Sequence, residues 1–109
     1  MFNFLKGSGV SQDQAYKELQ SNPSIKVIDV RTRDEYKSGH IAGSLNVDVY
    51  GAFATNIAKA CPDKAQRIFI ICESGARASS AVSFMKKDGY TDVHSIGGMG
   101  SWRYPTTRK

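Results

Sequence analysis

The chain has 109 residues, 40% of them hydrophobic and 23% charged, and its formal net charge is +5. This length favours one domain over residues 1–109, with a core over about 11–102 and short tails, and the composition is ordinary for a soluble globular protein. The absence of any run of roughly 18 apolar residues argues against a membrane protein, and the scattered basic residues argue against nucleic acid, so the positive charge suits small anions or acidic partners.

The segment from Met1 to Lys6 lacks a basic region followed by a long apolar run, and is therefore a poor secretory signal. Residues 11–20 predict an amphipathic helix, with Ser11 as N-cap and Gln14 as its capping-box partner. The β-branched run over residues 25–30 predicts a strand.

Thr32 and Glu35 form a second capping box, which opens one or two helical turns that end at Gly39. A loop with a short strand at residues 44–46 follows, and then a helix over 53–60. Residues 67–72 are the most apolar run of the chain, which is typical of a strand buried on both faces of a parallel sheet.

A glycine-containing loop precedes the next helix, over residues 78–87, and a last strand is expected over 93–96, before a turn or short helix that carries Trp102. Strands that alternate with helices indicate an α/β fold with a mostly parallel sheet. Ligands of such folds bind beyond the carboxyl ends of the strands, where the sequence places Asp29 and Cys72.

Cys61 and Cys72 do not form a zinc-type CxxC pair, and we expect reduced thiols and a cytoplasmic protein. A leader removed from a longer precursor is compatible with the sequence. A cysteine that ends an apolar strand is often only a small core residue.

The segment Cys72-Glu73-Ser74-Gly75-Ala76-Arg77 combines a thiol with an anion cradle. Nucleophilic sulfur chemistry requires a thiolate, and both a helix N-terminus and the amides of a curled loop stabilise an anion. Gly75 permits a positive φ, and Arg77 adds a guanidinium group that suits a tetrahedral oxyanion. The combination favours a reactive site over a core cysteine.

From about Ser11 to Trp102 the chain resembles the rhodanese homology domain. The resemblance rests on four segments in the right order: Val27 to Arg31 with Glu35-Tyr36, Gly39-His40-Ile41-Ala42-Gly43-Ser44-Leu45-Asn46, the Cys72 to Arg77 loop, and Gly97-Gly98 with Trp102.

The resemblance implies a mostly parallel sheet of about five strands flanked by helices, and sulfur transfer by double displacement. Cys72 would take the outer sulfur of a small anionic donor such as thiosulfate, hold it as a persulfide, and pass it to a thiol or to cyanide, with no metal or organic cofactor. Residues Glu73, Ser74, Gly75, Ala76 and Arg77 would bind the substrate. Asp29 and Arg31 would support the loop through ionic hydrogen bonds, and we expect a monomer.

Several alternatives stay open. Many family loops carry a basic or neutral residue where this chain has Glu73, which leaves room for a persulfide carrier that serves a protein acceptor and turns over little thiosulfate. A rhodanese-like phosphatase or arsenate reductase is the less favoured alternative, because it would need Cys-x5-Arg, one residue longer than the Cys-x4-Arg found here. We interpret His40 as a structural loop residue, Cys61 as a bystander and Trp102 as a core anchor.

Overall fold

The computed structural model describes residues 9–109, so our interpretation of residues 1–8 as a poor secretory signal and short tail lies outside the described residues. A parallel sheet has the strand order β2-β1-β3-β4. Gly9 adds one parallel bridge to Ser95, next to β4. The predicted α/β fold, with a sheet of about five strands, is confirmed. The strands are β1 (Lys26–Asp29), β2 (Leu45–Asn46), β3 (Ile68–Cys72) and β4 (Val93–Gly98).

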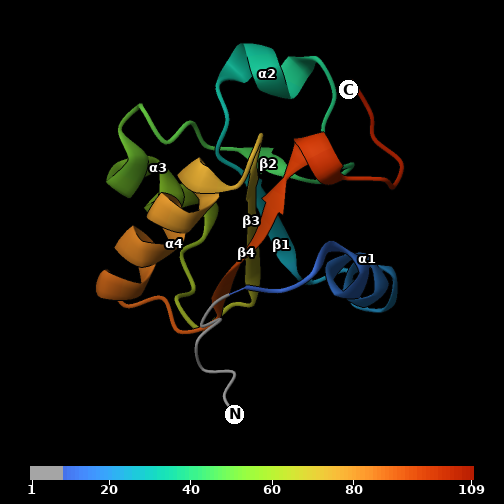
Figure 1. The fold of residues 1–109 in the computed structure, drawn as a ribbon. Helices are drawn as coiled ribbons and strands as arrows, with labels where there is room; N and C mark the ends of the chain where they lie inside the picture. The colour runs from blue at the N-terminus through green and yellow to red at the C-terminus, as the bar shows by residue number, and fades with distance from the viewer. Residues whose placement is uncertain (1–8) are drawn as a thin grey trace.

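Helices cover both faces of this sheet (Figure 1). In that view α3 and α4 lie on one side, α1 lies on the other, and α2 sits beyond the end of the strands, next to the C-terminus. None of the helices in the described part of the chain is long and apolar enough to cross a membrane. The helices are α1 (Gln12–Ser21), α2 (Arg33–Lys37), α3 (Phe53–Ala60) and α4 (Ala76–Lys87), with a 3₁₀ turn, η2 (Met99–Ser101).

Strand β3 is the centre of the core, because all five of its residues are buried. Its side chains alternate between two hydrophobic clusters, as the period of a strand requires. Phe69 and Ile71 join the cluster on the α1 side, whereas Ile68, Ile70 and Cys72 join the cluster that α3 and α4 cover. The apolar run predicted this two-sided burial, and the alternation directs Cys72 toward α4.

The capping signals fix where the helices begin. Thr32 and Glu35 form the complete capping box that the sequence predicts for α2. At α1 only half of the predicted box forms: Ser11 accepts from the Gln14 amide, but the Gln14 side chain binds Glu18 instead of returning to the cap. Helix α4 begins at Ala76, two residues before the predicted start, because the loop before it already turns into the helix.

Candidate active site

The Cys72 sulfur lies at the N-terminus of α4. It accepts hydrogen bonds from the amides of Gly75, at 2.9 Å, and Ala78, at 3.3 Å. Gly75 is the N-cap residue and has no side chain to offer, so the sulfur occupies the position of the usual capping oxygen. Two amide donors and the positive end of the helix dipole stabilise negative charge on this sulfur.

The loop around this sulfur has further backbone amides that could donate hydrogen bonds. Within residues 9–109, no hydrogen bond takes up the backbone amides of Ser74, Ala76 or Arg77. Gly75 has a φ of 110°, in the left-handed region that the sequence predicts for it, and this turn curls the loop. Free amides on a curled loop at a helix N-terminus form a binding site for an anion next to the thiol.

The end of β4 presses against the back of the loop. The Gly100 amide donates to the Glu73 carbonyl at 3.0 Å. A Cβ atom at Gly98 would lie 2.1 Å from the same carbonyl oxygen and 2.7 Å from the Ser74 nitrogen. Both distances are too short for any side chain at this position. Close backbone contact therefore explains Gly98 of the Gly-Gly motif, a reason that the sequence analysis did not give.

Arg77 is held by Glu35 of α2. The two guanidinium nitrogens donate to the two carboxylate oxygens at 2.7 and 2.9 Å. This pairing lowers the pKa of Glu35 to about 2 and raises the pKa of Arg77 above its ordinary value. Sequence reasoning gave Glu35 only a capping role and a place in the family pattern, and missed this contact. A role for Arg77 in donor binding stays a prediction.

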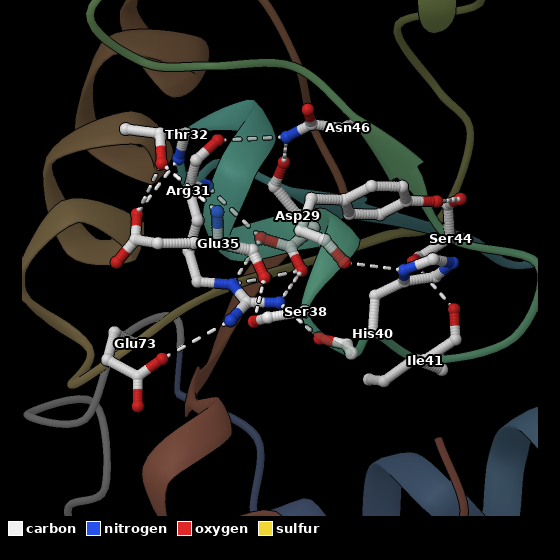
Figure 2. A network of polar contacts seen from close by, with 12 residues as sticks. Asp29, Arg31, Thr32, Glu35, Ser38, His40, Ile41, Ser44, Asn46 and Glu73 are labelled. Atoms are coloured by element: carbon white, nitrogen blue, oxygen red, sulfur yellow. Dashed lines mark hydrogen bonds and ion pairs between the residues drawn. The ribbon is translucent and has the colours of Figure 1, made fainter. Parts of the chain in front are cut away.

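Glu73 turns toward Arg31, while its side chain stays half-exposed (Figure 2). The Arg31 guanidinium donates to Glu73 at 3.3 Å, to Asp29 at 2.8 Å and to the carbonyl of Gly39 at 2.7 Å. Asn46 donates to the carbonyls of Asp29 and Arg31, which attaches β2 to the same network. The structure thus brings Asp29, Arg31 and Glu73 together, and part of the Glu73 charge is compensated.

The Asp29–Arg31 ion pair is buried, because both side chains are almost without solvent exposure. Each charge therefore depends on the other for compensation. Burial lowers the pKa of Arg31, but the hydrogen bonds and the negative charge of Asp29 outweigh it, so the pKa lies above the ordinary value. The guanidinium group keeps its charge and connects the end of β1, the loop after α2 and the loop over residues 72–77.

Three other residues singled out from sequence lie apart from this cradle. The His40 ring stacks on Tyr36, and its Nδ1 donates to the Tyr36 carbonyl at 2.7 Å. Cys61 is the buried C-cap residue of α3, and burial raises the pKa of its thiol. Trp102 packs at the edge of the α1-side cluster, half-buried, with no partner for its Nε1 among the described residues.

An open hollow of about 250 Å³ adjoins the loop, at the start of α4. Ala76 and Arg77 line it together with Val49, Tyr50 and Ser80. The Tyr50 ring is exposed and lies 5.9 Å from the Arg77 guanidinium carbon. The small Ala76 side chain leaves this approach to the loop open.

A model of the rhodanese-like domain matches residues 11–104. The chain belongs to the rhodanese-like domain family. It is 30% identical over 81 residues to thiosulfate sulfurtransferase PspE of Escherichia coli K12, and the match covers 74% of this chain and 77% of PspE. It is 31% identical over 93 residues to the "Putative sulfur carrier protein YrkF" of Bacillus subtilis, where the match covers 82% of this chain and 48% of YrkF.

The fold of this chain also resembles that of solved rhodanese structures. A structure of a rhodanese with anions from E. coli aligns with a TM-score of 0.72 at 28% identity, over 78% of this chain and 99% of that one. The family resemblance of the four motifs is therefore confirmed, and relatives of this rhodanese-like chain are named as sulfurtransferases.

Proposed function

We propose that Cys72 of this rhodanese-like chain carries a sulfane sulfur as a persulfide and transfers it from a donor such as thiosulfate to a thiol or cyanide. The observation that carries this proposal is the Cys72 sulfur under two amide donors at the start of α4, beside the free amides of the loop. A cysteine that served only as a core residue would not need these donors.

The reaction has two displacements. The Cys72 thiolate attacks the outer sulfur of thiosulfate, a new sulfur–sulfur bond forms, and the bond within thiosulfate breaks so that sulfite leaves with its electron pair. An acceptor thiolate or cyanide then attacks the outer sulfur of the persulfide and releases the Cys72 thiolate. The amides of Ser74, Ala76 and Arg77, which have no partner within residues 9–109, would stabilise the charged outer sulfur.

Backbone amides rather than net charge provide the attraction for an anionic donor. The charged side chains around the loop comprise two guanidinium groups and three carboxylates, all within the contacts of Arg31 and Arg77. Arg77 adds directional donors at the mouth of the loop, although Glu35 shares them. A solved rhodanese with anions from E. coli supports anion binding by this fold.

A persulfide carrier for a protein acceptor is the second candidate. The relative named as a sulfur carrier protein supports it, and so does the half-exposed Glu73 at the loop, which is unfavourable for repeated thiosulfate binding. Both candidates need Cys72 as a free thiol, and both cysteines are free in the structure. A reducing compartment such as the cytoplasm suits this requirement.

Mass spectrometry of the intact protein after thiosulfate treatment tests the proposal. We expect one added sulfur on the wild type and on Cys61→Ser, and none on Cys72→Ser. Cyanide should then remove the sulfur and yield thiocyanate. The reason for the difference is that burial raises the pKa of Cys61, while Cys72 lies among amide donors. Equal loss in both variants would indicate a dithiol mechanism and contradict the assignment.

A further inference from the structure

We propose that Arg33 and Lys37 of α2, together with Arg108 and Lys109, form a basic face that docks an acidic segment of a protein sulfur acceptor. These four exposed cations surround a hollow of about 260 Å³, which Tyr36 and His40 also line. The inference rests on the persulfide function proposed above and names the partner class for the second displacement.

The basic face is held in place by defined contacts. Thr107 and His40 exchange two backbone hydrogen bonds, of 2.9 and 2.8 Å, in an antiparallel bridge. Arg108 then donates from Nε to the Ser38 carbonyl at 3.3 Å. Two segments that lie about 70 positions apart in the chain are thereby fixed side by side. Figure 1 shows the C-terminal end next to α2.

The four cations are not neutralised by ion pairs with described residues. No ion pair within residues 9–109 includes any of them, whereas Arg31, Arg67 and Arg77 each have a carboxylate partner. Like charges gathered around one hollow repel one another, and an acidic ligand would relieve that repulsion. Charge complementarity of this kind steers encounter and sets the orientation of a partner.

The position of the basic face links it to sulfur transfer. Helix α2 carries two of the cations and also Glu35, which binds Arg77 of the catalytic loop. A partner docked on α2 therefore lies beside the cradle that holds the buried Cys72 sulfur. None of the residues that line the hollow belongs to the loop over residues 72–77, so a small donor bound there would not contact the Cys72 sulfur. Proteins supply acceptor thiols, whereas ordinary nucleotides do not, so we assign the face to an acidic protein segment.

The test uses the persulfide-loaded full chain and two cysteine peptides. One peptide joins its cysteine through a flexible linker to four glutamates, and the other has four glutamines instead. Mass spectrometry follows the loss of one sulfur from the protein. At low ionic strength we expect the glutamate peptide to react at least about tenfold faster, and we expect added salt to remove most of this preference, because exposed charges are screened.

A matched pair of variants separates the basic face from net charge. Arg108→Gln/Lys109→Gln should lose most of the preference for the glutamate peptide. Lys17→Gln/Lys59→Gln has the same net charge, changes two exposed lysines on α1 and α3, and should keep the preference. Equal losses in both double variants would overturn the docking proposal.

Three further outcomes are decisive. Equal rates for the two peptides would overturn the docking proposal and leave the persulfide function intact. Failure of the chain to acquire or transfer any sulfur would overturn the proposed function, and the docking proposal with it. Stronger inhibition by a single-stranded oligonucleotide than by a thiol-free glutamate peptide of equal charge would identify the face as a nucleic-acid surface and overturn the proposal.

Discussion

The ion pair between Glu35 and Arg77 lowers the positive charge that the proposed Cys72 loop, residues 72–77, would offer to an anionic donor. The pair has two short hydrogen bonds and lies only partly exposed to solvent. Arg77 therefore has a fixed orientation but a neutralised charge. An anion that approaches the loop competes with Glu35 for the guanidinium donors.

Opposite kinetic effects are expected from changing the two partners. Arg77→Ala should raise the KM for thiosulfate, because the donor loses a guanidinium contact. Glu35→Gln should lower that KM by about two- to fivefold at low salt, since it removes a competing charge and exposed pairs contribute about 0–1 kcal/mol. Steady-state kinetics at two ionic strengths would measure both. If neither variant changes the KM, Arg77 is a structural residue and the donor is bound by amides alone.

Gly98 lies against the backbone of the loop over residues 72–77 and leaves no room for a side chain. Gly98→Ala would force the Glu73 carbonyl to move, because the new Cβ would meet it at 2.1 Å. A shift of about 1 Å in a reacting group costs on the order of 100-fold in rate, so we expect at least that loss of kcat/KM in sulfur transfer to cyanide.

Gly51→Ala is the matched control, since a Cβ there would meet its nearest atom at an ordinary 3.6 Å. Circular dichroism should show both variants folded. Full activity in Gly98→Ala would mean that the loop tolerates displacement and that its geometry does not govern the reaction.

At the scale of elements, short-range signals predicted most of the fold. Thr32 marks the start of α2, and the buried run of β3 marks the sheet centre. Helix α4 begins two residues before the start that the sequence predicts, because the backbone after Gly75 already adopts the helical turn that binds the Cys72 sulfur. Such a start has no capping side chain in the sequence, so capping rules do not detect it.

Long-range contacts between elements were not predictable from the residues alone. Sequence patterns predict Asp29 and Cys72 at the carboxyl ends of two strands, and the structure has them there, with Arg31 two residues after the end of β1. They did not reveal that Arg77 contacts Glu35 of α2, since that contact depends on the packing of two helices that β2, α3 and β3 separate in the chain. The buried Asp29–Arg31 pair was expected as loop support, and its energetic role is open to test.

Arg31→Met should destabilise the protein by about 3–5 kcal/mol, because it leaves the buried Asp29 carboxylate without its counter-charge. For a domain of this size, that loss lowers the Tm by at least about 12 °C. Thermal unfolding would measure the change.

Arg33→Met, on the exposed side of α2, is the control and should shift the Tm little. Arg31→Lys keeps the charge but loses the fork geometry, and should fall between the two. A Tm of Arg31→Met equal to that of the control would show that the buried pair does not support the elements it joins.

At the scale of the whole molecule, the tertiary fold gathers charges that the sequence scatters. The basic residues look dispersed along the chain, yet the bridge between His40 and Thr107 brings the tail to α2. The net charge of +5 suits small anions or acidic partners, but the sequence does not show where such a partner would bind. The position of a charge in space requires strand pairing that no local pattern encodes.

Global stability should depend on acid pH through Glu35. Its pKa is about 2 in the folded chain against an ordinary value of 4.5, and Arg77 is the main cause. A carboxyl whose pKa is lowered by folding stabilises the protein fully above its unfolded pKa, and loses this contribution as the pH falls through the folded pKa. The Tm of the wild type should therefore exceed that of Glu35→Gln at pH 6, and the difference should shrink between about pH 5 and pH 2.

Thermal unfolding of both proteins across this range checks the prediction. Glu18→Gln tests the same effect on another helix, because Arg67 lowers the pKa of Glu18, and its Tm difference from the wild type should also shrink as the pH falls. A difference between wild type and Glu35→Gln that stays constant from pH 6 to pH 2 would show that the ionised pair does not contribute to the stability of the fold.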